Sequence, residues 1–179
     1  LYLADPEFSA IPVDQMLSAD YAASIRKQIN PEKAHQKLPE TILPPHKHTV
    51  YISVIDKDRN ACSFINTVFH SFGAGLMAPN SGIVLQCRGQ GFVVEPGHPN
   101  CVLPGKRPLH TIIPGMATKD GKTVMSFGVM GGEYQAFGHM QFLTRLLDYG
   151  MDIQEAQDCA RFFPDPFSDV VEVEEAISE

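Results

Sequence analysis

The chain has 179 residues, of which 44% are hydrophobic and 20% are charged, which is the usage of an ordinary globular domain and not of a disordered chain. Its formal net charge of −7 disfavours nucleic acid and anionic membrane surfaces as partners, because both need clustered Lys and Arg. No apolar run reaches the roughly 18 to 20 residues that a membrane span requires, so no span is expected.

Neither the cysteines nor the start of the chain assigns a compartment. The four cysteines, at 62, 87, 101 and 159, form no CxxC pair and no zinc-ligand spacing, which predicts buried free thiols. The chain begins with Leu1, and no basic stretch precedes an apolar one, so no targeting peptide is expected. We interpret the chain as a processed product or as a fragment of something longer.

The first 48 residues differ in character from the rest. Residues 18–29 place apolar side chains at three- and four-residue spacing behind Ser18, a good N-cap, which predicts a helix. Residues 30–48 carry four prolines and no apolar periodicity, which predicts an exposed linker. The predicted organisation is therefore a first region, 1–48, and a second region, 49–179.

Two hairpins are predicted in the second region. β-branched and alternating residues at 49–56 and 61–69 flank a polar turn. Residues 111–118 and 123–130 flank Lys-Asp-Gly-Lys, where Asp-Gly suits the positive φ of a tight turn. Antiparallel pairing is expected in both places.

Helical patterns follow the hairpins. Gly131-Gly132 breaks the second strand, and apolar spacing from Met140 predicts a helix that closes at Gly150. Asp152, with a glutamate three residues later, resembles a capping box for a short helix. Hairpins followed by helices predict an α+β layered domain.

Metal and nucleotide sites have little support. His46 and His48 lie two residues apart in the linker, with no carboxylate or thiol at ligand spacing, so no metal site is predicted. The glycines match neither GxxxxGK[ST] nor a GxGxxG that opens a helix, which argues against nucleotide binding. No cofactor is expected.

Thr49 is the candidate nucleophile, because the proline-rich linker ends directly before it. If the His48–Thr49 peptide bond were cut, Thr49 would carry both a hydroxyl and a free α-amine. The pKa of an α-amine is about 8, so near neutral pH it can accept the proton of the hydroxyl. One residue then supplies nucleophile and base. Threonine also often begins a strand, and spacing alone leaves this structural interpretation open.

Several ordered blocks lie between Thr49 and Glu174. They are Thr49–Ala61, Phe72-Gly-Ala-Gly75, Ser81-Gly-Ile-Val-Leu85, Pro104-Gly-Lys-Arg-Pro108, the Lys-Asp-Gly hairpin, Gly131-Gly132 and Ala160-Arg-Phe162. Together they resemble the catalytic small subunit of the γ-glutamyltranspeptidase family, and residues 1–48, with Ala4-Asp-Pro6, resemble the end of its large subunit. The resemblance implies the N-terminal nucleophile hydrolase fold, an αββα sandwich of which this chain builds part.

The resemblance also implies roles for individual residues. Thr49 matches the nucleophile, and His48–Thr49 matches the bond that the family cleaves autocatalytically. Thr67 matches a threonine whose hydroxyl hydrogen-bonds the nucleophile. Gly131 and Gly132 match paired glycines whose N–H groups form the oxyanion hole, a task that suits residues without a side chain.

The substrate-binding positions depart from the family's pattern. Phe69, Arg88 and Gly91 stand where typical transpeptidases carry an asparagine, a glutamine and an aspartate. A buried ammonium without a counter-charge is costly, so a γ-glutamyl donor should bind poorly. His110-Thr111 replaces a pair of serines and could still donate hydrogen bonds. Arg88 could pair with the carboxylate of a dicarboxylic acyl group or form a structural ion pair, and both alternatives stay open.

The implied function is that of a γ-glutamyltransferase-like amide hydrolase or acyltransferase, an enzyme related to glutathione metabolism. It would act through an acyl-Thr49 intermediate on a small γ-glutamyl or dicarboxylic-acyl amide, with hydrolysis favoured over transfer. The competing interpretation is a catalytically silent or unprocessed homologue that serves as a structural or interaction module. The expected partner is the missing large-subunit segment, and a homo-oligomer stays open.

Overall fold

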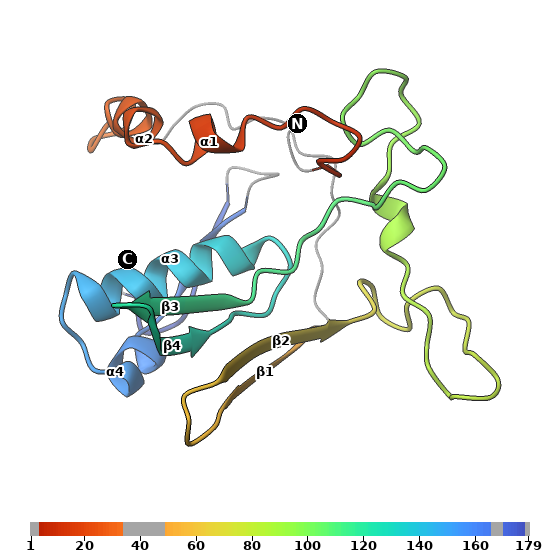
Figure 1. Cartoon of the computed structure of the whole chain (residues 1–179). Helices are drawn as coiled ribbons and strands as arrows, with labels where there is room; N and C mark the ends of the chain where they lie inside the picture. Colours follow the sequence, from red (N-terminus) through yellow and green to blue (C-terminus); the bar gives the residue numbers. More distant parts are fainter. Residues whose placement is uncertain (1–3, 34–48, 166–169, 178–179) are drawn as a thin grey trace. The chain divides into compact units, whose positions relative to one another are not determined.

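The structure, a computed structural model, describes residues 4–33, 49–165 and 170–177 (Figure 1). Most of the predicted linker, with His46 and His48, lies outside these residues. The chain divides into two compact units, Leu1–Leu43 with Gly89–His110, and Pro44–Arg88 with Thr111–Glu179. No helix in the described ranges is long and apolar enough to span a bilayer.

The first unit contains the helix predicted behind Ser18. After the short α1 (Val13–Met16), α2 spans Ala19–Arg26, and the Ser18 hydroxyl accepts a hydrogen bond from the N–H of Tyr21 at 3.1 Å. The helix ends three residues earlier than predicted. Its end follows from Pro31, because the residue before a proline avoids the helical conformation and the last turn tightens to three-residue bonds.

A buried carboxylate joins the two segments of the first unit. Asp5, 3% exposed, accepts hydrogen bonds from the backbone N–H of Arg107 at 2.9 Å and from its guanidinium at 2.7 and 3.1 Å. Nearby, the hydroxyl of Ser9 donates to the carbonyl of Pro99 at 2.7 Å. The Arg107 guanidinium holds the pKa of Asp5 well below its ordinary value. Two blocks noted in the sequence, Ala4-Asp-Pro6 and Pro104-Gly-Lys-Arg-Pro108, thus contact each other.

Both predicted hairpins are present in the second unit. Strand β1 (Thr49–Ile55) pairs with β2 (Ala61–Thr67), and β3 (Gly115–Lys119) pairs with β4 (Lys122–Phe127), in each case antiparallel. Strand β3 begins four residues later than predicted, directly after Pro114, which has no N–H for a ladder.

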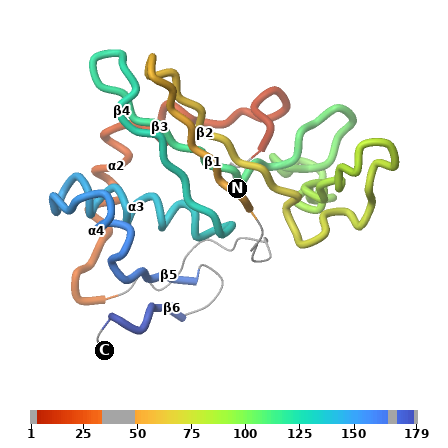
Figure 2. The backbone as a smooth tube through the Cα atoms, turned by 90° about the horizontal axis from the view of Figure 1, so that it is seen from below, coloured from red at the N-terminus to blue at the C-terminus, as the bar shows by residue number. Residues whose placement is uncertain are grey.

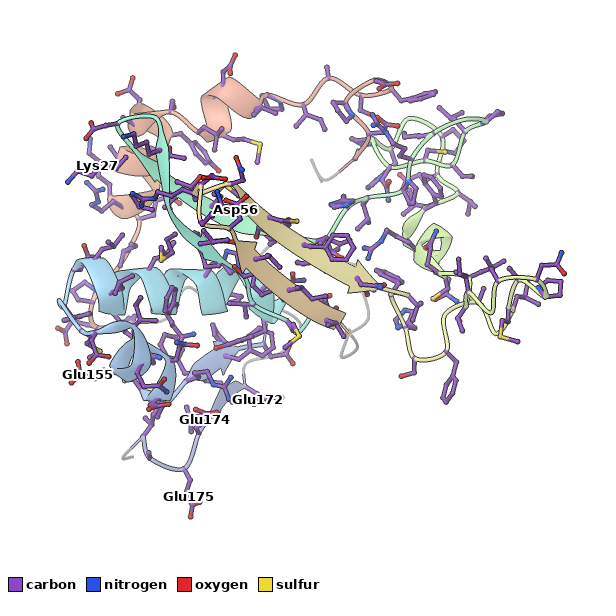
Figure 3. The ribbon with its side chains drawn as sticks, turned by 60° about the horizontal axis from the view of Figure 1, so that its bottom comes forward. Lys27, Asp56, Glu155, Glu172, Glu174 and Glu175 are labelled. Atoms are coloured by element: carbon purple, nitrogen blue, oxygen red, sulfur yellow. The ribbon has the colours of Figure 1, made fainter. Side chains whose placement is uncertain are left out.

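Each hairpin turn follows from its own sequence. At the tip of the first, the Asp56 carboxylate accepts the N–H groups of Asp58 and Asn60, both at 2.9 Å (Figure 3). In the second, Asp120 and Gly121 have φ of 52° and 73°, the pair of positive values that Asp-Gly was expected to supply.

A tyrosine joins the two hairpins. The hydroxyl of Tyr51 on β1 lies 2.9 Å from the Ser63 hydroxyl on β2 and 3.1 Å from the Ser126 hydroxyl on β4. The Ser63 hydroxyl also donates to the carbonyl of Phe127 at 3.3 Å. The ring of Tyr51 lies against Gly128, where an added Cβ would be 2.4 Å from a ring carbon.

Helix α3 (Tyr134–Leu147) runs beside the second hairpin in Figure 1, with Phe127 5.2 Å from the ring of His139 and 6.3 Å from that of Phe142. It begins six residues earlier than the apolar spacing indicated, directly behind the Gly131-Gly132 turn. Its Gly138 leaves room for Val129 and Tyr134 side chains. The glycine turn therefore serves as the entry to a helix.

The end of the second unit packs on α3. Helix α4 (Ile153–Asp158) has the predicted capping box, with Asp152 accepting the Glu155 N–H at 2.8 Å (Figure 3). Strands β5 (Phe162–Pro164) and β6 (Val171–Val173) pair side by side in Figure 2, and Arg161 forms an ion pair with Glu174. The ring of Phe163 lies 5.5 Å from that of Phe137 on α3.

The cysteine prediction is correct only in part. All four thiols are free, but Cys87 alone is buried, whereas Cys62 is exposed and Cys101 and Cys159 are half-buried. Cys62 lies on an exposed position of the short hairpin, where alternation turns every second side chain outward.

Candidate active site

Thr49 and Thr67 face each other at the open end of the first hairpin. They are directly opposite in the β1–β2 register, which places both side chains on the same face. The Thr49 hydroxyl donates to the Thr67 hydroxyl at 3.5 Å, and the Thr67 hydroxyl accepts the N–H of Phe69 at 3.1 Å. His48, the predicted partner in the cleavage bond, lies outside the described residues.

Phe69 has an unusual backbone for a bulky residue. Its φ is 78° and its side chain is 2% exposed. A non-glycine residue in this region costs about 1–3 kcal/mol, whereas asparagine tolerates it better. The ring nevertheless lies under the Arg88 guanidinium, whose Cζ is 4.6 Å from the ring centroid. Phe69, at the position where the resemblance expects an asparagine, thus packs against the charged side chain of Arg88.

Arg88 is buried, and among the described residues no carboxylate pairs with it. Its exposed fraction is 8%, and one guanidinium nitrogen donates to the Thr111 hydroxyl at 2.6 Å. The ion pairs found in the described ranges do not include Arg88, so the structural ion pair considered for it is not observed there. Burial lowers the pKa of this guanidinium, although an arginine side chain stays protonated in proteins. An anion would therefore find a desolvated cation here.

The Gly131-Gly132 turn presents two N–H groups. Its φ values are 126° and 60°, which L side chains rarely adopt. The Gly131 carbonyl accepts the N–H of Tyr134, and the Gly132 carbonyl accepts that of Gln135, both at 3.1 Å. No hydrogen bond from either glycine N–H is found among the described residues. Because N–H and C=O point in opposite directions across a trans peptide, the Gly132 N–H points away from the start of α3.

Gln135 connects this turn to the residues around Arg88. Its side chain is 3% exposed, and its amide nitrogen donates to the Thr111 carbonyl at 2.8 Å and to the Gly132 carbonyl at 3.1 Å. A continuous set of contacts thus links the threonine pair to the glycine turn; its members are Thr49, Thr67, Phe69, Arg88, Thr111, Gln135 and Gly132. Helical spacing drew attention to α3 only from Met140, so sequence reasoning missed Gln135. Its position three residues after Gly132 could have indicated it, since a first-turn side chain reaches back to the residue before the helix.

Not all of the predicted site residues belong to the same unit. His110 and Gly91 belong to the first compact unit, and Thr111 belongs to the second. Within the described ranges, no three His, Cys, Asp or Glu side chains converge as metal ligands. A cavity of about 510 Å³ lies among β4, α3 and α4 and is lined in part by Phe127, Met130 and Tyr134. Neither the threonine pair nor the glycine turn lines it.

Comparison with known proteins identifies relatives of the whole chain. The family described as gamma-glutamyltranspeptidase matches residues 1–179. A glutathione hydrolase proenzyme of Pseudomonas sp. (strain A14) is 39% identical over 175 residues, which cover 90% of this chain and 30% of that protein. The glutathione hydrolase-like YwrD proenzyme of Bacillus subtilis is 40% identical over 154 residues, or 86% and 29% of the two chains. The chain therefore spans less than a third of the length of these relatives.

Solved structures show the same relationship. Cephalosporin acylase from Bacillus halodurans is similar over 98% of this chain and 31% of its own, with a TM-score of 0.83 and 39% identity. Gamma-glutamyltranspeptidase from Pseudomonas nitroreducens aligns over 63% of this chain and 64% of its own, with a TM-score of 0.58 and 28% identity. These likenesses confirm the predicted α+β class and the N-terminal nucleophile hydrolase fold. The chain belongs to the γ-glutamyltranspeptidase family.

Proposed function

We propose that the protein containing this chain is an amide hydrolase or acyltransferase whose nucleophile is the hydroxyl of Thr49. The observation that carries the proposal is the contact of that hydroxyl with Thr67 at the open end of the first hairpin. Relatives named glutathione hydrolase proenzymes support a mature form made by processing. Processing between His48 and Thr49 would free the α-amine that serves as base.

Maturation would use the same hydroxyl. The Thr49 oxygen attacks the His48 carbonyl carbon, the C–N bond breaks, and the acyl group moves from nitrogen to oxygen as an ester. Water then hydrolyses the ester, leaving a carboxylate on His48 and a free α-amine on Thr49. Relative to the peptide bond, one water molecule is consumed and no other reactant is needed.

Turnover would follow in two halves. The α-amine takes the proton of the Thr49 hydroxyl while the oxygen attacks the substrate carbonyl. The oxyanion accepts hydrogen bonds from the N–H groups of Gly131 and Gly132, and loss of one such donor typically costs about 3–4 kcal/mol. The leaving amine takes the proton, and water or an acceptor amine then attacks acyl-Thr49.

The acyl group is proposed to carry a carboxylate and no α-ammonium, as a glutaryl group does. Arg88 supports this, because it is buried, charged and without a carboxylate partner in the described part of the chain. Its free donors would hold the distal carboxylate, with Thr111 fixing the guanidinium. Phe69 offers an ammonium no hydrogen-bond acceptor from its side chain. His110, the residue before Thr111 in the sequence, is proposed as a substrate-binding residue on the family resemblance alone.

Two measurements on the whole protein test the proposal. Glutaryl p-nitroanilide should be hydrolysed at least tenfold faster, in kcat/KM, than γ-glutamyl p-nitroanilide, and Arg88→Gln should remove most of that preference. Arg26→Gln, which changes an exposed arginine, is the matched control. A clear preference for the γ-glutamyl compound would contradict the assignment of the acyl group.

The nucleophile is tested separately. Thr49→Ala should abolish both turnover and the appearance of a new chain that begins Thr-Val-Tyr-Ile by N-terminal sequencing, because the attacking oxygen is gone. Ser53→Ala, on the same strand and exposed, should leave both unchanged. Survival of either activity in Thr49→Ala would rule out this nucleophile, and a wild-type protein that never cleaves would favour a silent homologue.

A further inference from the structure

We infer that Gln135 is a positioning residue that holds the Gly131-Gly132 turn in the conformation that presents its N–H groups to the oxyanion. This inference rests on the proposed function. It concerns neither the nucleophile nor the donors themselves, but the side chain behind them.

The geometry places two donors on one carbonyl. The Gly132 oxygen accepts both the backbone N–H and the side-chain amide of Gln135, each at 3.1 Å. Two hydrogen bonds restrain the Gly132–Glu133 peptide, which directly follows the Gly132 N–H in the chain, more firmly than one. Consecutive glycines have wide conformational freedom, so the turn needs such a constraint from outside itself.

The same amide also fixes the turn relative to the acyl-binding residues. It donates a hydrogen bond to the Thr111 carbonyl at 2.8 Å, while the Thr111 hydroxyl accepts a hydrogen bond from the Arg88 guanidinium at 2.6 Å. One residue, Thr111, therefore contacts both the cation proposed to bind the carboxylate and the side chain that holds the turn. The substrate carbonyl must stay aligned with the N–H groups that stabilise its oxyanion, and this alignment needs a rigid connection because small displacements lower the rate strongly.

Stability does not explain the glutamine. Its side-chain oxygen is buried and has no hydrogen-bond partner among the described residues. An unpaired buried acceptor is unfavourable, which offsets much of what the two donated bonds contribute. A methionine of similar volume would fill the same space without the unpaired oxygen. The amide at this position is accounted for by geometry.

The chain contains a matched control on the same helix. Gln141 is also buried, at 4% exposed, and its amide donates to the Phe162 carbonyl at 2.7 Å while its oxygen accepts the Phe162 N–H at 3.1 Å. This glutamine joins α3 to β5, and none of the hydrogen bonds found for its side chain within the described ranges reaches the glycine turn. Gln141→Met thus removes the same chemistry from the same helix at a position outside the proposed site.

The test compares Gln135→Met and Gln141→Met in the whole protein, with glutaryl p-nitroanilide as substrate. Gln135→Met should lower kcat about 10- to 100-fold with KM changed less than threefold, because the contact matters when the oxyanion forms. Gln141→Met should lower the melting temperature and leave kcat per folded molecule within twofold. Autoproteolysis of each variant is followed by mass spectrometry, so that kcat is expressed per mature chain.

Ligand binding supplies a second measurement. A boronic acid with a carboxyalkyl chain adds to the Thr49 hydroxyl as a tetrahedral boronate, whose oxygen occupies the oxyanion position. Its affinity should weaken in Gln135→Met by about the same factor as kcat, while binding of the product glutarate stays unchanged. Wild-type kcat in Gln135→Met, or equal losses in both variants or for both ligands, would overturn the inference. Failure of the proposed function is a distinct result, namely turnover that survives Thr49→Ala.

Discussion

The proposed nucleophile depends on two threonine hydroxyls that the pairing of β1 and β2 brings together. Thr49 and Thr67 are eighteen positions apart, yet they meet because antiparallel strands place opposite residues on one face. The Thr67 hydroxyl accepts from Phe69 N–H as well, so its orientation is set by the backbone that follows it. This arrangement makes Thr67 a positioning residue for the proposed nucleophile.

Thr67→Val tests this residue. The variant keeps the shape of the side chain and removes the acceptor, so the Thr49 hydroxyl loses its fixed direction, and kcat should fall about 10- to 100-fold. Steady-state hydrolysis of glutaryl p-nitroanilide gives the value. Thr118→Val, an exposed threonine on β3, serves as control, and an unchanged kcat in Thr67→Val would exclude the role.

Sequence reasoning reached Thr49 and Thr67 but not the contacts around them. Thr49 could be predicted because its context, a linker and then a strand, is local. The hydrogen bond from Gln135 to the Thr111 carbonyl and the stacking of Arg88 on Phe69 join residues far apart in the sequence, and no periodicity encodes them. That no carboxylate pairs with Arg88 in the described part of the chain likewise depends on the tertiary structure, which the sequence alone leaves open.

Elements were predictable wherever a short-range interaction defines them. The Ser18 cap, the Asp152 capping box and the Asp120-Gly121 turn involve partners within three residues, and each is confirmed. Element starts were less accurate. Strand β3 and helix α3 begin at Gly115 and Tyr134, where a proline and a glycine turn, and not apolar spacing, set the boundary.

The bend after β2 provides a prediction at this scale. Gly73 and Gly75 both have positive φ values, 55° and 69°. An added Cβ at Gly73 would lie 2.2 Å from the Leu85 carbonyl oxygen, whereas an added Cβ at Gly75 would meet no described atom within 4 Å beyond its chain neighbours. Gly75→Ala should cost about 1–2 kcal/mol through its φ alone. Gly73→Ala should cost clearly more, because backbone must move.

Thermal unfolding of the two variants side by side gives the comparison. Gly73→Ala should have the lower melting temperature, and equal melting temperatures would show that the bend relaxes freely around residue 73.

At the scale of the whole molecule, the Asp5–Arg107 contact has a consequence for maturation. Asp5 precedes the proposed cleavage bond and Arg107 follows it, so the contact would join the two product chains.

The chain spans about 30% of its relatives, and many apolar side chains on its hairpins are exposed, among them Ile52 and Phe64. The remainder of the protein is therefore proposed to cover those faces.

The ion pair predicts a pH dependence with a definite sign. Because Arg107 lowers the pKa of Asp5 below its ordinary value of 3.8, the stabilisation is present above pH 3.8 and is lost as pH falls towards the folded-state pKa. Arg107→Gln should therefore lower the melting temperature at pH 6, and the difference from wild type should shrink as pH falls below 3.8.

Lys57→Gln removes an exposed partner of Asp58 and should give little difference at any pH. A melting-temperature difference for Arg107→Gln that stays constant from pH 6 to pH 3 would contradict the pairing as its source.

The Tyr51 ring against Gly128 bears on how this family can vary. Two serine hydroxyls hold the phenol in place, so the ring cannot easily withdraw from a new methyl group. Gly128→Ala should be tolerated far better beside Tyr51→Ala than beside tyrosine. In a saturation library scored for activity, the loss of activity on replacing Gly128 should depend on the residue at position 51. Substitutions at the two positions are therefore expected to covary among related sequences.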